Sequence, residues 1–251
     1  MINHKIAKLP SIRIVQGCGS PSQLYFGMHY NFVDLEKMKQ IDLMIFDLDG
    51  TLVNSGGDII TSVNHTLKTL DIPKKKPDEI IGFVGDGIQK MIERSLGKDH
   101  QNLFNDAIGI FSDYYAKHML DTTTLCDYVI EVLEHFSEKR KVIITNKRKY
   151  FTVEMTDALG ISEYFDEIIG ADSTDYKKPD PRLLFPRIEK YGTGFDNTVV
   201  IGDGVNDIML AKNAGVLSCA LMNGLTHRDI LLALNPDFAC EGLSELISIF
   251  R

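Results

Sequence analysis

The chain has 251 residues, of which 44% are hydrophobic and 25% are charged. This composition is typical of a globular protein and excludes the fibrous and disordered classes. The formal net charge of -8 argues against a general nucleic-acid binder, because that role needs a basic face that displaces phosphate counterions. An acidic protein can still bind an anionic small molecule through main-chain N–H groups, a lysine and a metal ion.

The cysteines and the hydropathy together predict a cytoplasmic protein. The four cysteines lie far apart and form no CxxC pair, which favours reduced thiols. They are Cys18, Cys126, Cys219 and Cys240. No stretch approaches the ~20 apolar residues of a membrane span, and the N-terminus lacks a charged-then-apolar signal pattern. We therefore expect no membrane contact.

Residues 1–40 show no sustained helical or strand period and contain the interrupting run Gly-Cys-Gly-Ser-Pro. We interpret them as an N-terminal extension outside the main fold. A short strand at Ile12–Val15 and packing of Phe26 and Tyr30 are alternatives to disorder, and composition does not decide between them.

From residue 41 onward, short apolar runs bounded by polar or glycine residues predict buried parallel strands. These runs are 41–46, 141–146, 167–171, 198–202 and 217–221. Helical patterns alternate with them at about 150–159, 181–191, 206–214, 227–233 and 243–250. The alternation predicts an α/β fold with a doubly wound, mainly parallel sheet, whose ligands bind at the carboxyl ends of the strands.

The stretch 57–136 interrupts this alternation and carries helical periodicity instead. The predicted helices are 58–70, 77–81, 87–95, 101–119 and 128–136. We interpret the stretch as a helical cap domain inserted into a core that comprises residues 41–56 and 137–251.

Asp47 and Asp49 directly follow the first predicted strand, and Gly50 and Thr51 come next. Two carboxylates at the end of a buried strand are costly unless a metal ion or hydrogen bonds stabilise them. The pair therefore indicates a metal site, whereas an isolated Asp-x-Asp is more often a solvated turn.

Other polar residues stand at comparable positions. Thr145 and Asn146 end a core strand, where a hydroxyl and main-chain N–H groups can bind phosphate oxygens or simply cap a helix. Lys178 precedes a Pro-Asp-Pro turn that opens a helix, and Lys177 is the alternative candidate for its role. Lys178 is suited to neutralising a phosphate or a carboxylate, and the alternative is a surface lysine.

Asp203 and Asp207 follow the apolar run that ends at Gly202. Asp207 stands at a helix start, where a carboxylate is favourable without any ligand. Asp203 has no such explanation, so it indicates a cation.

Together these residues resemble the four ordered motifs of the haloacid dehalogenase superfamily. The motifs are Asp47-Leu-Asp49-Gly-Thr51, Thr145-Asn146, Lys178-Pro-Asp-Pro181 and Gly202-Asp203-Gly-Val-Asn-Asp207. Within it the chain is similar to the phosphoglycolate phosphatase group. The runs that carry this closer resemblance are Thr51-Leu-Val-Asn-Ser55, Gly82-Phe-Val-Gly-Asp-Gly87 and Ile169-Gly-Ala-Asp172. The chain departs from many members at Asn54, where they have Asp.

The resemblance implies a Rossmann-like core and a Mg²⁺-dependent phosphatase acting on a small phosphate monoester, with 2-phosphoglycolate expected. It implies that Asp47 is the nucleophile of an aspartyl-phosphate mechanism and that Asp49 is the general acid and base. Thr145 and Lys178 would complete the catalytic set, with the Asn146 backbone binding the phosphoryl group.

The same resemblance implies a magnesium site with oxygen ligands only. The expected ligands are Asp47, the backbone carbonyl of Asp49, and Asp203. Asp207 is expected to support these ligands without contacting the metal itself. Gly85, Asp86 and Gly87 in the cap are expected near the part of the substrate that is not phosphate, or they form only a helix-entry turn.

Several alternatives share this core. They are a pyrophosphatase, a sugar or nucleotide phosphatase, a phosphomutase and a non-catalytic phosphate-sensing or partner-binding protein. A dehalogenase is disfavoured because it needs neither Asp49 as acid and base nor the magnesium carboxylates. The expected partner is a small-molecule phosphate ester, and the protein is expected to be a monomer or homodimer.

Overall fold

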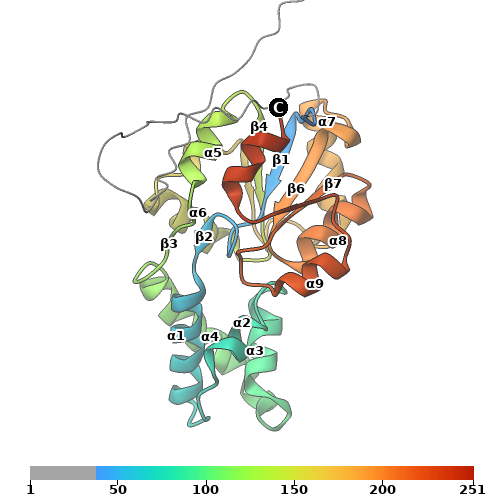
Figure 1. Ribbon diagram of the computed structural model, residues 1–251. Helices are drawn as coiled ribbons and strands as arrows, with labels where there is room; N and C mark the ends of the chain where they lie inside the picture. Colours follow the sequence, from blue (N-terminus) through green and yellow to red (C-terminus); the bar gives the residue numbers. More distant parts are fainter. Residues whose placement is uncertain (1–37) are drawn as a thin grey trace, which may run out of the picture.

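Six parallel strands form the central sheet, in the order β5-β4-β1-β6-β7-β8 (Figure 1). The structure is a computed structural model that describes residues 38–251. The strands are β1 (Leu43–Phe46), β4 (Arg140–Ile144), β5 (Glu167–Ile169), β6 (Thr198–Gly202), β7 (Leu217–Leu221) and β8 (Phe238–Cys240). The predicted α/β fold with a mainly parallel sheet is confirmed. Expectations for Ile12–Val15, Cys18, Phe26 and Tyr30 lie outside the described residues.

β1 lies in the middle of the sheet, between β4 and β6, which places its carboxyl end beside theirs. Phe46 pairs in register with Ile143 of β4 and Ile201 of β6. The Asp47 N–H then donates to the carbonyl of Ile201 at 3.0 Å, so the sheet pattern continues to the first acidic residue. Polar residues that follow these three strands consequently meet at one edge of the sheet.

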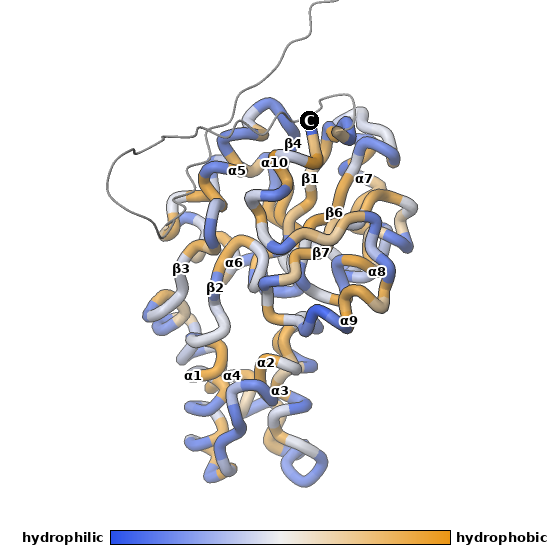
Figure 2. Tube along the Cα trace, viewed as in Figure 1, coloured by the Kyte–Doolittle hydropathy of each residue, from blue (hydrophilic) through white to orange (hydrophobic). Residues whose placement is uncertain are grey.

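Side chains alternate between the two faces of each strand, and both faces are covered by helices. Leu43 and Ile45 of β1 pack toward α7 (Phe185–Tyr191) and α8 (Val205–Ala214). Met44 and Phe46 belong to the opposite core, together with residues of α5 (Val129–His135), α6 (Lys149–Ala158) and α10 (Leu246–Ile249). Burial on both faces explains why the strands are mostly apolar (Figure 2).

A separate group of helices lies beyond the carboxyl edge of the sheet (Figure 1). It consists of α1 (Gly56–Thr69), α2 (Pro77–Ile81), α3 (Ile88–Leu96) and α4 (Phe104–His118), with a 3₁₀ turn at Lys98–Leu103. The short antiparallel strands β2 (Val53–Asn54) and β3 (Thr124–Leu125) pair where the chain enters and leaves this group. We call α1 to α4 the helical layer. Among the described helices none is long and apolar enough to cross a membrane.

The structure differs from the sequence prediction in several places, and the paired strands β2 and β3 were not predicted. α5 lies within the predicted cap range 57–136, but it packs beside α10 next to the sheet. Residues 38–40 were assigned to the extension. Met38 is nevertheless buried, and the backbone of Lys39 forms an isolated parallel β-bridge with Phe250. β8 was not predicted, because its three residues follow Pro and Asp and carry no clear period.

Candidate active site

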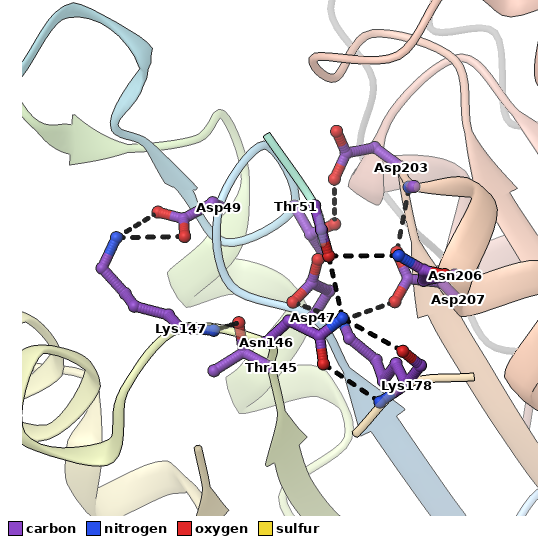
Figure 3. Close-up of polar contacts among 12 residues, drawn as sticks. Asp47, Asp49, Thr51, Thr145, Asn146, Lys147, Lys178, Asp203, Asn206 and Asp207 are labelled. Carbon is purple, nitrogen blue, oxygen red and sulfur yellow. Dashed lines mark hydrogen bonds and ion pairs between the residues drawn. The ribbon is translucent and has the colours of Figure 1, made fainter. Parts of the chain in front are cut away.

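The loop after β1 turns sharply beneath Asp203 (Figure 3). Gly50 has φ +85°, and a Cβ there would lie 2.2 Å from an Asp203 carboxylate oxygen, so only glycine fits. The Thr51 hydroxyl donates to Asp203 Oδ1 at 2.8 Å. The Leu225 N–H donates to Asp203 Oδ2 at 2.6 Å. Asp203 is thereby fixed over the loop that carries Asp47.

Lys178 joins two of the predicted site carboxylates. Its Nζ lies 2.7 Å from Asp47 Oδ1 and 2.6 Å from Asp207 Oδ1, and its side chain is 2% exposed. Burial opposes the charge of the ammonium, but the carboxylates of Asp207 and Asp47 outweigh it and raise the pKa of Lys178 above its ordinary value. The other Asp207 oxygen accepts from the Gly204 N–H at 2.9 Å. Lys178 is therefore a permanent cation at this edge of the sheet.

Asn146 positions the segment that carries Lys178. Its Oδ1 accepts from the Lys178 N–H at 3.0 Å, and its Nδ2 donates to the Lys178 carbonyl at 3.2 Å. The same Nδ2 donates to the Gly85 carbonyl at 2.8 Å, which ties the helical layer to the sheet edge. The adjacent Thr145 is buried, and its hydroxyl oxygen accepts from the Lys147 N–H at 3.2 Å.

Three carboxylates converge without enough positive charge to neutralise them. Ligand oxygens of Asp47, Asp203 and Asp207 lie within 4.8 Å of one another. Burial, together with the Asp47 carboxylate, raises the pKa of Asp203 to about 7 and also raises the pKa of Asp207. Asp47 Oδ1 is buried and accepts no well-directed hydrogen bond from any described residue. A divalent cation with a preference for oxygen ligands fits this donor set.

The Asp49 carboxylate points away from this cluster, toward Lys147 (Figure 3). Lys147 Nζ donates to both Asp49 oxygens, at 2.8 and 3.0 Å, and to the Tyr115 hydroxyl at 2.7 Å. The Ser55 hydroxyl also donates to Asp49. Burial again opposes the charge, but Asp49 outweighs it and raises the pKa of Lys147. Burial raises the pKa of Tyr115 to about 12, so its hydroxyl stays protonated.

The loop before α3 faces the site from the helical layer. The Asn206 side chain donates to the Gly85 carbonyl at 3.1 Å and to Asp86 at 2.7 Å. Arg94 pairs with Asp86 at 2.6 Å. Gly87, with φ +85°, precedes the first residue of α3. The Asp86 carboxylate thus already has hydrogen-bond and ion-pair partners. Its contact with Asn206 links the helical layer to the core.

Two cavities are lined by Asp47. One is lined by Asp47, Asp49, Gly85 and Gly87 together with Lys147, and its other walls are mostly apolar. A second is lined by Asp47 and Asp49 again, and by Asp86, Lys178, Asp203 and Asp207. The structure therefore brings the sequence-predicted site residues to one region.

Sequence reasoning missed four residues that contact this region. Lys147 was detectable, because it directly follows Thr145-Asn146 at the end of a predicted strand. Asn206 lies inside the fourth motif. Tyr115 and Leu225 have no local signal, since each reaches the site from an element distant in sequence.

Comparison with known proteins gives a consistent assignment. The chain matches the family described as Haloacid dehalogenase-like hydrolase over residues 44–221. A phosphoglycolate phosphatase of Vibrio parahaemolyticus is 32% identical over 84% of this chain and 96% of its own length. One from Colwellia psychrerythraea is 33% identical, with coverage of 84% and 97%.

Solved structures agree with the sequence match. The crystal structure of a predicted phosphoglycolate phosphatase from Haemophilus somnus superposes with a TM-score of 0.79 at 26% identity, covering 83% of this chain and 97% of that one. A haloacid dehalogenase-like family protein of Streptococcus pneumoniae gives 0.75 at 26% identity, with the same coverage. The chain, with its acidic loop after β1 and its buried lysine, belongs to the haloacid dehalogenase-like hydrolase family.

Proposed function

We propose that this protein is a Mg²⁺-dependent phosphatase that hydrolyses 2-phosphoglycolate through an aspartyl-phosphate intermediate. The observation that carries the proposal is the convergence of Asp47, Asp203 and Asp207 within 4.8 Å at the carboxyl ends of β1 and β6, where the buried Lys178 pairs with Asp47 and Asp207. The names of the similar proteins from Vibrio and Colwellia support the choice of substrate.

Asp47 is the proposed nucleophile. It follows the central strand β1 at the carboxyl edge of the sheet. There its carboxylate oxygen can attack phosphorus and form a covalent aspartyl-phosphate. Lys178 would stabilise the negative charge that the phosphoryl oxygens carry during transfer, because its ammonium is buried and already oriented. The Thr145 hydroxyl and the main-chain N–H of Asn146 would bind the same oxygens from β4.

Asp49 is the proposed general acid and base. It lies two residues after Asp47 and lines the same apolar cavity, where the leaving group of an ester bound at Asp47 would sit. It would protonate the leaving oxygen in the first step and activate a water molecule in the second. Both tasks require its carboxylate to turn from Lys147 toward the ester.

The carboxylates fit a magnesium ion. Asp47 and Asp203 would hold it with their side chains and Asp49 with its backbone carbonyl, while Asp207 would keep Lys178 in place. When bound, Mg²⁺ would neutralise the converging carboxylates and the phosphoryl charge. The buried Asp47 oxygen, which pairs with Lys178 but lacks a well-directed hydrogen bond, and the raised pKa of Asp203 support this assignment.

Cavity size favours a short leaving group. The apolar cavity beside Asp49 has a volume of about 70 Å³. Pockets for drug-sized ligands measure roughly 300–1,000 Å³. A two-carbon acid fits this space better than a sugar or a nucleoside, which would have to enter the larger cavity, of about 380 Å³, beside Lys178 and Asp203.

The test is phosphate release from a panel of substrates with purified protein and saturating Mg²⁺. The panel contains 2-phosphoglycolate, pyrophosphate, a sugar phosphate and a nucleotide. We expect kcat/KM for 2-phosphoglycolate to exceed the others by at least ~10-fold, or about 1.4 kcal/mol of transition-state discrimination. Chelation with EDTA should abolish release, and added Mg²⁺ should restore it. A tenfold preference for another substrate would refute the phosphoglycolate assignment but not the phosphatase mechanism.

A further inference from the structure

We infer that Lys147 recognises the carboxylate of the substrate, and that the substrate carboxylate displaces Asp49 from Lys147 as it binds. The inference deepens the proposed function and rests on it. It assigns the specificity for an acidic leaving group to one lysine beside the fourth strand, a residue outside the four sequence motifs.

The ammonium of Lys147 is already built into a carboxylate-binding site. Its Nζ donates to both oxygens of Asp49 and to the Tyr115 hydroxyl, all within 3.0 Å. Its side chain is only 8% exposed. Nζ also lies 4.8 Å from the centroid of the Tyr115 ring. A buried ammonium in fixed geometry binds a carboxylate more strongly than a solvated one does.

The site lies where the leaving group of an ester must go. Lys147, Asp47 and Asp49 line the same cavity. The remaining walls are largely apolar. They include Ile59, Val84, Ile88, Met91, Phe111 and Phe151. A phosphoryl group at Asp47 would therefore direct its short organic part into an apolar pocket with a buried cation at one side.

Exchange of carboxylates explains how recognition and catalysis are coupled. A substrate carboxylate can take the two oxygen positions that Asp49 occupies, which leaves the charge balance at Lys147 unchanged. Asp49 is then released from its ion pair and can turn toward the leaving oxygen. A neutral ester cannot displace Asp49 in this way, so most of its complexes would keep the acid tied to Lys147.

Other candidates for the carboxylate are weaker. Asp86 pairs with Arg94 and accepts from Asn206, and the Gly85 carbonyl faces the sheet edge as an acceptor. The Gly85 carbonyl and the Asp86 carboxylate would both repel the carboxylate of the substrate. Arg148 also lines the cavity, so it provides the natural comparison for Lys147.

The experiment compares two esters of similar length. One is 2-phosphoglycolate, and the other is 2-hydroxyethyl phosphate, which replaces the carboxylate by a neutral alcohol. Both release an alkoxide that needs a proton from Asp49. A change at Asp49 that affects both esters equally cancels in the ratio of the two kcat/KM values, so the ratio reports on carboxylate recognition together with the release of Asp49 that recognition causes.

We expect wild type to prefer 2-phosphoglycolate by at least 100-fold, and Lys147→Met to lower this preference at least 30-fold, mainly through KM. Arg148→Met and the exposed control Lys149→Met should keep the preference within threefold of wild type. Lys147→Gln, which keeps a hydrogen-bond donor without the charge, should behave like Lys147→Met and replaces it if that variant does not fold. Thermal melting monitors folding of every variant.

Two results are distinguishable. If wild type hydrolyses 2-phosphoglycolate and the Lys147 variants keep the wild-type preference, or Arg148→Met loses it instead, the inference is wrong while the proposed function stands. If wild type hydrolyses neither ester with Mg²⁺, the proposed function fails and this inference fails with it.

Discussion

Asp47 influences the protonation of the other charged residues of the site. It lies 2.7 Å from Lys178, and its carboxylate contributes to the raised pKa of both Asp203 and Asp207. Because Asp47 lies just past the last paired residue of β1, its side chain can change without loss of core packing. Chemistry and folding are therefore separable at this position.

Asp47→Asn should abolish phosphate release while leaving the fold intact. The amide is nearly isosteric, but it is neither a nucleophile nor a good magnesium ligand. We expect a fall in kcat of at least ~1000-fold, measured by phosphate release, with a melting temperature close to that of wild type.

The matched control for this variant is Asp229→Asn, an exposed aspartate in α9 (Arg228–Ala233). It should keep kcat within twofold of wild type. Activity of Asp47→Asn within tenfold of wild type, from protein free of contaminating phosphatase, would show that another group is the nucleophile.

At the scale of elements, Asp58 near the start of α1 fastens the two chain segments that join the helical layer to the core. Its carboxylate accepts from the N–H and hydroxyl groups of Thr122 and Thr123, at 2.6 to 3.1 Å. Burial acts to raise the pKa of Asp58, but these hydrogen bonds outweigh it and hold the pKa below its ordinary value. The ionised carboxylate therefore stabilises the folded state.

Asp58→Asn should lower the melting temperature at pH 7 by about 4–8 °C, which corresponds to about 2 kcal/mol for charged hydrogen bonds. A folded pKa below the unfolded one gives stability that is present above the unfolded value, about 3.9, and is lost as the pH falls through the folded value. The difference between the variant and wild type should therefore shrink below pH 4.

Differential scanning calorimetry at pH 7 and at acid pH measures this effect. Asp113→Asn, an exposed aspartate on α4, provides the control and should leave the melting temperature unchanged. An Asp58→Asn variant as stable as wild type at pH 7 would mean that the hydrogen bonds contribute nothing net to stability.

At the scale of the whole molecule, all the proposed site residues lie within residues 38–251. Removal of residues 1–37 should keep kcat/KM for 2-phosphoglycolate within threefold of the full chain. Removal of residues 1–40 should lower the melting temperature, because the Lys39 N–H donates to the Ile249 carbonyl at 2.8 Å and its carbonyl accepts from Arg251 at 3.0 Å. Equal loss of activity in both truncations would show that the first 37 residues contribute to the active protein.

The fold class and the family could be predicted from the order and spacing of the residues. Apolar runs that end in polar or glycine residues are local signals, because a strand buried on both faces is apolar along most of its length. Asp47 and Asp203 each follow such a run directly, and Thr145 lies near the end of another. The parallel arrangement then requires their side chains to approach one another, so most of the candidate site was predictable from strand ends alone.

The partner of each of these residues could not be predicted and became known only from the folded chain. Asp49 was predicted as an acid, but its pairing with Lys147 spans 98 positions in sequence, and Tyr115 reaches the same lysine from α4. α5 was assigned to the cap by its helical period, yet period does not tell which surface buries the apolar face. Such contacts join segments that are distant in sequence and meet only in the folded chain, so no local pattern of residue types encodes them.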